Sequence, residues 1–356
     1  MRRILVILLL LLSGLRLSAQ EPDSSRVVRE QDNSLIGKAS RLIGNASAWF
    51  QDLTPVKIFN ARDTSYYSAP PGDWTIKVRS NLTGTYLSAR GHSDDRNFTT
   101  RLAAQHNLTQ SIGVTYKGVT LGYTFSPWQR DGHDIRYDFS AYSNMAGIDA
   151  TYRTISSFSG YAEADGERLG EIAENQASQH ILSINTFYFF NYKQFSFPAS
   201  INQSYYQLKS AGSWIAGLSY TRDQTSVPSV GGSPEFNVNS RLVALGGGYG
   251  YTWVPQRKGW QVMIAVMPKL VVYDSGHLKL EYDDEGRARP VGYDIRQALR
   301  QPEATLNGYF AAVHWFRRYF FLGLTASLDG YSIGNYGTYT LTQFRWEAHL
   351  AIGARF

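Results

Sequence analysis

The sequence predicts an all-β transmembrane antiparallel barrel of about twelve strands, preceded by a short amino-terminal periplasmic helical extension. Residues 344–356 alternate between a purely apolar face and a largely charged face, as a strand with one lipid-facing side would. Aromatic residues make up 14% of the chain, although its mean hydropathy is only −0.30. A barrel wall is half lumen-facing and half lipid-facing, so this combination is typical of a protein of the bacterial outer membrane. A soluble periplasmic β-protein is the alternative.

Residues 1–19 predict a secretory signal peptide. Two arginines precede an apolar run from Ile4 to Leu12, and small residues stand just before Gln20. Removal of this segment lowers the net charge from +6 to +3. The remaining chain has no basic stripe interleaved with aromatics, so no nucleic acid partner is expected. The chain has no cysteine, which excludes a disulfide framework and a lipoprotein anchor.

Residues 20–73 are expected to form a periplasmic extension. Apolar residues recur at spacings of three and four over residues 35–53, which predicts an amphipathic helix. Such a helix could lie on the membrane surface, enter the barrel or dock against its rim. Pro70-Pro71-Gly72 predicts a linker before the first strand.

The barrel is expected to occupy residues 74–356, where the periodicity changes to two. Ile76 and Val78 alternate with Lys77 and Arg79 at its start. The expected strands are 74–86, 101–116, 119–125, 135–143, 146–155, 180–191, 206–222, 240–254, 260–273, 304–316, 319–330 and 340–356. Their number is even, as a barrel with both termini in the periplasm requires.

The connections between these strands alternate in length, which indicates the orientation of the barrel. The short turns are 117–118, 143–145, 255–259 and 317–318, and the opposite end carries the mostly longer loops 89–97, 127–134, 156–179, 223–239, 274–303 and 331–339. Short periplasmic turns and long external loops are the rule in such barrels. Residues 192–205 form a periplasmic connection longer than its peers, and a strand within it would make the count odd.

Five blocks of the sequence resemble a known family. They are Asp63–Tyr66, Trp74–Lys77 with Asn81–Leu82, Phe189–Ala199, Lys209–Trp214 and Gly246–Tyr251. In these residues the chain resembles a Bacteroidota domain of unknown function whose members are predicted outer-membrane barrels. The resemblance covers roughly residues 63–356 and implies a barrel in the bacterial outer membrane. It implies no activity and supplies no catalytic residue.

Charged residues on the inward phase of the expected strands form the candidate site. They are Lys77, Arg79, Arg101, Asp149, Arg153, Arg345, Glu347, His349 and Arg355. The first and last strands must pair when the barrel closes, so the charges on these strands should form one mostly basic patch inside the wall. This patch either guides a small anionic solute, or pairs internally through Glu347 and Asp149 to fill a narrow lumen.

The apolar phase of the last strand predicts an outer-membrane insertion signal. Its residues are Phe344, Trp346, Leu350, Ile352 and Phe356. The expected partners are therefore outer-membrane lipid and the barrel-assembly machinery, which would bind this carboxy-terminal strand.

No residue pattern in the chain predicts catalysis. His349 is the one histidine clearly on the inward phase of an expected strand, and no serine motif with a neighbouring base accompanies it. The acidic loop segments lack the spacing of a metal site. We therefore expect no enzyme, no cofactor and no metal, and a role as a narrow pore, a transport component or a structural scaffold. The alternative is a barrel enzyme acting on lipid or surface glycan, with His349 as its base.

Overall fold

The computed structural model describes residues 61–356 apart from 70–71, 94–95, 105–106, 117, 126–134, 234–235, 256–258, 275–279, 283–287, 291–302, 317–318 and 336–338. The predicted signal peptide at 1–19 and the predicted helix at 35–53 lie outside the described residues. No helix in this part of the chain has the length and apolar character needed to cross a membrane.

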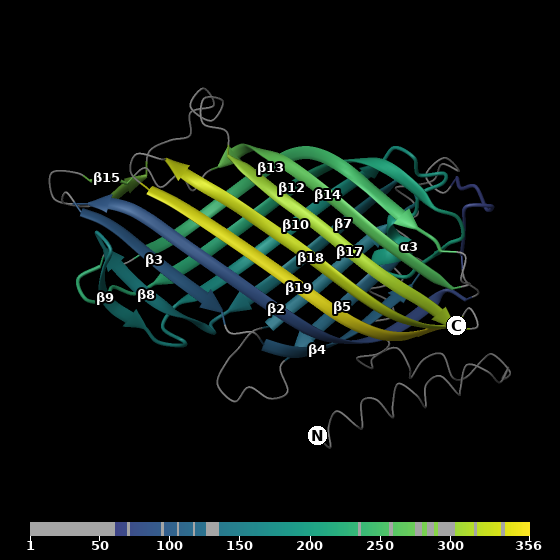
Figure 1. The fold of residues 1–356 in the computed structure, drawn as a ribbon, viewed down its shortest axis with the longest axis horizontal. Coiled ribbons are helices and arrows are strands. Elements are labelled where there is room, and N and C mark those ends of the chain that lie inside the picture. The colour runs from purple at the N-terminus through teal and green to yellow at the C-terminus, as the bar shows by residue number, and fades with distance from the viewer. Residues whose placement is uncertain are drawn as a thin grey trace, which may run out of the picture. The chain divides into compact units, whose positions relative to one another are not determined.

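Twelve antiparallel strands close into a barrel (Figure 1). In order round the wall they are β2 (Trp74–Ser93), β4 (Asn107–Tyr116), β5 (Val119–Phe125), β6 (Ile135–Tyr142), β7 (Ala146–Ile155), β10 (Ser178–Phe189), β12 (Ala211–Val227), β13 (Phe236–Trp253), β14 (Trp260–Asp274), β17 (Ala304–Phe316), β18 (Phe320–Asn335) and β19 (Tyr339–Arg355). The last strand, β19, pairs with β2 from Tyr339↔Gly91 to Arg355↔Thr75 and closes the wall. The predicted fold class and strand number are confirmed.

The wall carries its apolar side chains outside, as the alternation predicts. On β19, Leu350 is 53% exposed and Ile352 is 65% exposed, whereas Lys77 on the adjacent β2 is only 4% exposed. Exposed aromatics border this apolar surface: Trp214, Trp253, Trp260, Phe316 and Phe320 near the end that holds the carboxy terminus, and Tyr86, Tyr137, Tyr152 and Tyr273 farther along the strands. An apolar exterior around a polar interior is the arrangement of an outer-membrane barrel and the reverse of a soluble protein. The chain is an outer-membrane β-barrel.

The predicted strand at 101–116 is wrong, because it is two strands with different neighbours. β3 (Arg96–Ala104) pairs with the second half of β2, whereas β4 pairs with the first half. The pairing changes from one half of β2 to the other between Ala104 and Asn107, while the apolar residues of the sequence keep their two-residue period, so the pattern alone does not reveal the break. The predicted external loop at 156–179 is also wrong. It contains β8 (Phe158–Ala164) and β9 (Glu167–Ile172), which extend the sheet in the order β2-β3-β8-β9.

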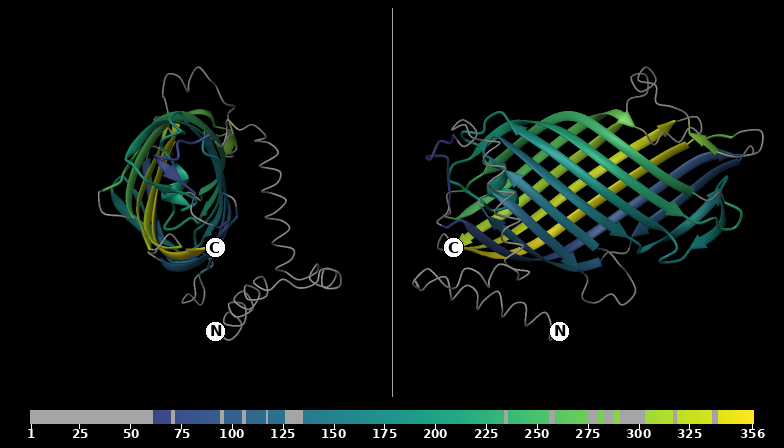
Figure 2. Two further views of the ribbon diagram at one scale, coloured as in Figure 1. Left: turned by 90° about the vertical axis from the view of Figure 1, so that its right-hand side faces the viewer. Right: turned by 180° about the vertical axis from the view of Figure 1, so that it is seen from behind.

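The long connection after β10 forms a plug, which we define as residues 192–210. Its helix α3 (Phe197–Ile201) begins at Ser196, whose Oγ accepts a hydrogen bond from the Ala199 amide at 3.3 Å. Viewed from the carboxy-terminal end of the barrel, in the left panel of Figure 2, this helix lies within the ring of strands. Its strand β11 (Tyr206–Gln207) pairs with β1 (Tyr67–Ser68), so the segment that precedes the barrel holds the plug at the end that contains the carboxy terminus.

The lumen is packed with apolar side chains towards both ends. The layer at the end that holds the carboxy terminus joins the plug to the wall, and we call it the periplasmic layer after the predicted orientation. It consists of Tyr142, Phe187, Phe189, Phe195, Phe197, Ala211, Ile215, Met263, Ala265, Met267 and Ala311. The external layer joins β3, β8 and β9 to the wall and consists of Leu87, Ala89, Leu102, Ala104, Ile155, Phe158, Ile172, Ala177, Ile181, Val227, Leu242, Ala244, Val271, Tyr331 and Leu341. Gly250 makes room for the plug, because a Cβ atom there would lie 3.0 Å from the Phe195 ring.

Candidate functional site

Charged side chains gather inside the barrel between the two apolar layers. We call this group the charged band: Lys77, Arg79, Arg136, Asp138, Asp149, Arg153, Asp329, Arg345, Glu347 and His349. These residues come from β2, β6, β7, β18 and β19, and they line a cavity of about 180 Å³. The inward phase of five strands therefore converges on one polar chamber.

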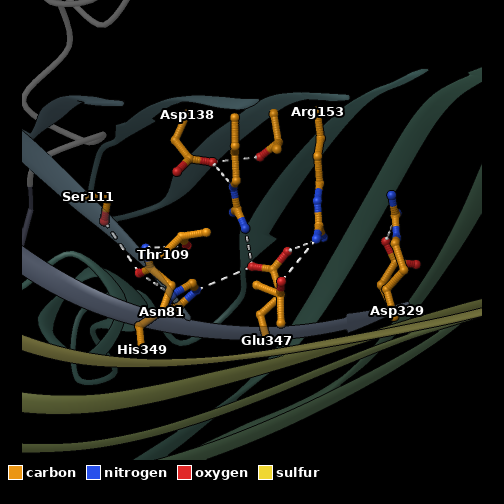
Figure 3. A network of polar contacts seen from close by, with 12 residues as sticks. Asn81, Thr109, Ser111, Asp138, Arg153, Asp329, Glu347 and His349 are labelled. Carbon is orange, nitrogen blue, oxygen red and sulfur yellow. Dashed lines mark hydrogen bonds and ion pairs between the residues drawn. The ribbon is translucent and has the colours of Figure 1, made fainter. Parts of the chain in front are cut away.

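Glu347 is the centre of the charged band (Figure 3). Its Oε2 atom accepts a hydrogen bond from Arg136 and lies 3.2 Å from Nε2 of His349, and its Oε1 atom lies 3.5 Å from Nη1 of Arg153. The other ring nitrogen of His349, Nδ1, is 2.7 Å from Oδ1 of Asn81 on the neighbouring strand β2. One carboxylate thus ties β19 to β6 and β7 across the lumen. A buried charge requires such partners, because leaving it unpaired is costly.

Asp138 on β6 is the second carboxylate with several partners. It accepts hydrogen bonds from Nε of Arg136 at 2.6 Å, from Thr151 Oγ1 at 3.1 Å and from Nη2 of Arg79 at 3.2 Å. Arg79 reaches it from β2 across β4 and β5. A Cβ atom on Gly122 of β5 would lie only 3.3 Å from Nη2 of Arg79. The absence of a side chain at Gly122 therefore leaves the path along the wall open.

The remaining members of the charged band differ in how they are paired. Asp329 and Arg345 face each other across β18 and β19 with an Oδ2–Nη2 distance of 2.5 Å. Lys77 and Asp149 have no opposite charge within 4.0 Å among the described residues. Nζ of Lys77 lies 3.4 Å from the side-chain oxygen of Gln203 in the plug, and Asp149 accepts a hydrogen bond from the Tyr142 hydroxyl. The band is therefore attached to the plug through Lys77.

The structure places most of the predicted site residues together. Lys77, Arg79, Asp149, Arg153, Arg345, Glu347 and His349 all line the cavity. Arg355 is also buried but lies at the plug, where Nη1 donates to the Ser204 carbonyl at 2.5 Å and Nε donates to the Gly72 carbonyl at 2.9 Å.

The prediction that Arg101 faces the lumen is wrong. Its side chain is 38% exposed and bonds to the Tyr161 hydroxyl at 2.9 Å and to Glu163 at 3.6 Å. The neighbouring Leu102 points into the external layer instead. The assumption that apolar side chains face lipid fails here, because this part of the lumen is itself apolar.

Three important residues of the charged band were missed: Arg136, Asp138 and Asp329. Each stands on the inward phase of an expected strand, at 135–143 or at 319–330, so the same alternation could have found them. With them the cavity is lined by five arginines and lysines and by four carboxylates. The prediction of a mostly basic patch is therefore wrong, because the carboxylates nearly balance the cations.

The residues of the predicted insertion signal lie on the outer wall. Phe344, Leu350, Ile352 and Phe356 are all exposed there. The indole of Trp346 covers Gly84 of β2, where a Cβ atom would lie 2.5 Å from the indole nitrogen. This placement leaves the strand's apolar face available to lipid. Its role as an insertion signal stays a prediction.

The segment before the barrel is fixed to the plug by hydrogen bonds at the periplasmic mouth. The Tyr67 hydroxyl donates to the Tyr192 carbonyl at 2.6 Å, and burial raises the pKa of this phenol. The Asp63 amide donates to the Lys193 carbonyl at 2.8 Å. Hydrogen bonds from Ser65 to the Asp63 carboxylate lower the pKa of that group. The blocks Asp63–Tyr66 and Phe189–Ala199, which carry the resemblance, meet at this point.

A family model described as "Domain of unknown function (DUF4421)" matches residues 61–356. None of the curated proteins matches the sequence. Among solved structures, the chain is similar to the outer membrane protease OmpT from Escherichia coli (8% identity, 81% of this chain and 98% of that chain, TM-score 0.38). It is also similar to the translocator domain of the autotransporter NalP from Neisseria meningitidis (10% identity, 90% and 98%, TM-score 0.33). A third is the COG4313 outer membrane channel from Pseudomonas putida F1 (12% identity, 82% and 99%, TM-score 0.30). At these scores the likenesses carry no argument about activity.

Proposed function

The chain belongs to the DUF4421 family, whose function is unknown, and we propose from its geometry that it is a non-enzymatic outer-membrane barrel that acts as a structural scaffold with a closed lumen. One observation carries this proposal. The charged band lies between two apolar layers whose side chains are 0–8% exposed, and the carboxylates of Glu347 and Asp138 each hold two arginines within it. Apart from Lys77 and Asp149, the charges of the band thus form ion pairs with one another.

Both layers oppose the passage of an ion. An ion that moves through an apolar layer loses its hydration shell, which costs several kcal/mol even after relaxation. Narrow apolar constrictions also exclude water. Phe195, Phe197 and Phe189 in the periplasmic layer are fully buried. The closed lumen therefore favours a scaffold over an open pore.

Planar-bilayer recording tests this proposal. We expect the purified full-length protein, inserted in a bilayer in 1 M KCl, to show no steady conductance steps. Its heat-modifiable migration on a gel serves as the control for folding. Stable steps from folded protein would reject the scaffold and establish a pore.

A gated transport component is the second candidate function, and the cavity of about 180 Å³ is the observation that favours it. Its charges could hold a small anionic solute if the plug moved. The variant pair Phe195→Ala with Phe197→Ala loosens the plug and distinguishes the two functions. A gated component would conduct in bursts, and Arg79→Glu with Arg345→Glu would then reverse its ion preference. A scaffold stays silent, because the external layer remains closed.

The non-enzymatic part of the proposal rests on the contacts of His349. Its two ring nitrogens are engaged by Asn81 and Glu347, and within the described residues no hydroxyl is hydrogen-bonded to it. The histidine therefore has no free nitrogen to act as a base. Incubation with phospholipid and with lipopolysaccharide tests this, with fatty acid or sugar release as the readout. Release that disappears in His349→Gln would establish the enzyme alternative.

The partners and the source of the chain belong to the same proposal. The exposed apolar face of β19 supports binding of the carboxy-terminal strand by the barrel-assembly machinery. A Phe356→Ser variant that assembles in the outer membrane as fast as the unchanged chain would remove that support. The Bacteroidota origin and the signal peptide stay predictions.

A further inference from the structure

Two arginines face outward from neighbouring strands, directly opposite each other. Arg222 of β12 and Arg241 of β13 are register partners. Their sequence neighbours Asp223 and Leu242 point into the barrel and are almost fully buried, so both arginine side chains lie on the outer wall. Two like charges directly opposite each other destabilise a pair of strands. This pair is therefore unfavourable unless a nearby negative charge offsets the repulsion.

Neither arginine is paired with an acid in the described part of the chain. The adjacent carboxylate, Asp223, points inward and accepts hydrogen bonds from Gln179, Thr225 and Tyr331. Asp274 on the next strand, β14, is likewise buried. The Nε atom of Arg222 is buried without any hydrogen-bond partner. The pair thus combines an unsatisfied buried donor with two positive charges on the outer wall, and two adjacent guanidinium groups without a carboxylate have the chemistry of an anion site.

The pair lies at the outer border of the apolar exterior. Residues 241–253 of β13 span roughly 40 Å of strand between Arg241 and the exposed Trp253. At a strand tilt of about 40° this is roughly 30 Å of height, slightly more than the apolar band of about 25 Å in such barrels. Arg222 is the register partner of Arg241 and therefore lies at nearly the same height. The two guanidinium groups therefore reach the level at which the headgroups of outer-leaflet lipids lie.

The residues next to the arginine pair are aromatic and apolar, as expected for a site that binds a lipid with an anionic headgroup. Tyr220 and Val243 are the next outward pair towards the periplasm, and Tyr273 is the partner of Val243 on β14. Below them Leu218 and Leu245 are exposed on the apolar wall, where acyl chains would lie. The guanidinium groups lie above outward-facing apolar side chains, as a lipid headgroup lies above its acyl chains.

We propose that Arg222 and Arg241 bind a phosphate group of an outer-leaflet lipid. The planar fork of a guanidinium donates two parallel hydrogen bonds to phosphate oxygens, so two opposed forks can hold one phosphate between them. The phosphate neutralises the repulsion across β12 and β13. This site goes beyond the scaffold function and does not depend on it, because it lies on the outer wall and not in the lumen.

Lipid binding to the full-length protein in detergent tests the proposal. The probe is diphosphorylated lipid A, with its dephosphorylated counterpart and inorganic phosphate as comparisons, and native mass spectrometry gives the affinity. Charge-assisted hydrogen bonds are each worth about a factor of ten or more. We therefore expect R222Q with R241Q to weaken binding of the phosphorylated probe at least tenfold. The matched control, R90Q with R168Q, removes the same charge from β2 and β9 and should change it less than twofold.

Thermal unfolding gives a second readout that a merely structural role would not produce. Without lipid, R222Q with R241Q should be at least as heat-stable as the unchanged protein, because the repulsion is gone. With the phosphorylated probe only the unchanged protein should gain stability. R241K alone should keep part of the binding and serves if the double variant does not fold. Equal binding by the variants, or equal affinity for dephosphorylated lipid, would overturn the proposal. Displacement by an equal concentration of inorganic phosphate would instead identify a free-anion site and overturn the lipid assignment.

Discussion

Replacing Glu347 with glutamine tests whether the charged band holds the barrel together. Glu347 has three cationic or polar neighbours, namely Arg136, Arg153 and His349, and its side chain is only 13% exposed. Arg136 keeps Asp138 as a partner in the variant, but Arg153 loses its ion pair with Glu347. Removing one partner of a buried ion pair typically costs about 3–5 kcal/mol. Because Arg136 remains paired, we expect a loss of about 3 kcal/mol in the free energy of unfolding.

Urea unfolding of the refolded protein in micelles, followed by tryptophan fluorescence, measures this loss. The matched control is Glu163→Gln, which removes the same charge from the partly exposed pair with Arg101. Such surface pairs contribute about 0–1 kcal/mol. Adding Arg136→Gln to Glu347→Gln should not cost the sum of the two single losses, because the residues share one network. If Glu347→Gln and Glu163→Gln cost the same, the band is not a structural cross-link and the reasoning is refuted.

Three further changes probe the plug, the wall and the unpaired acid. Phe197→Ala removes a fully buried ring from the plug and should lower the free energy of unfolding by about 3–5 kcal/mol, which urea unfolding measures. It should not produce conductance in bilayer recordings, since the external layer stays closed. Gly122→Val should separate Arg79 from Asp138, because a Cβ atom there lies 3.3 Å from the guanidinium, and should cost about 1–3 kcal/mol in the same unfolding assay. Asp149→Asn should cost less than Asp138→Asn, because Asp149 bonds to one hydroxyl while Asp138 holds two arginines; equal losses would contradict this.

The barrel itself could be predicted from the sequence because its signal is local. Each strand has to place apolar side chains on the lipid side, and the two-residue period records this along every strand. The break between β3 and β4 cannot be seen in this period, because a change of neighbouring strand does not change the alternation of apolar and polar residues. The strands β8 and β9 were taken as loop because their charged residues, such as Glu163 and Glu167, resemble those of a solvated segment.

The candidate site was predicted in part for the same reason. The inward phase located Arg79, Arg345 and Glu347, because the first and last strands of a barrel must meet. Which charges pair depends on register and on the direction in which long side chains cross the lumen, and the sequence does not contain this directly. Arg136 and Asp138 illustrate the limit, since their strand was expected but its place opposite Glu347 was not.

The width of the barrel accounts for all three layers of the lumen together. Eight strands enclose a space that wall side chains can just fill, and twelve strands enclose a wider one. The additional space is filled differently at each level. The plug with Phe195 and Phe197 fills it in the periplasmic layer, and inward apolar side chains of the wall and of its extension β3-β8-β9 fill it in the external layer. At the middle no additional segment is present among the described residues, and arginine is one of the longest side chains able to reach the opposite wall. An arginine there needs a carboxylate, because an unpaired buried charge is costly. Paired charges are thus the expected way to fill the middle of a wide barrel that has no additional segment there, and this pairing explains why the cations and carboxylates of the charged band nearly balance.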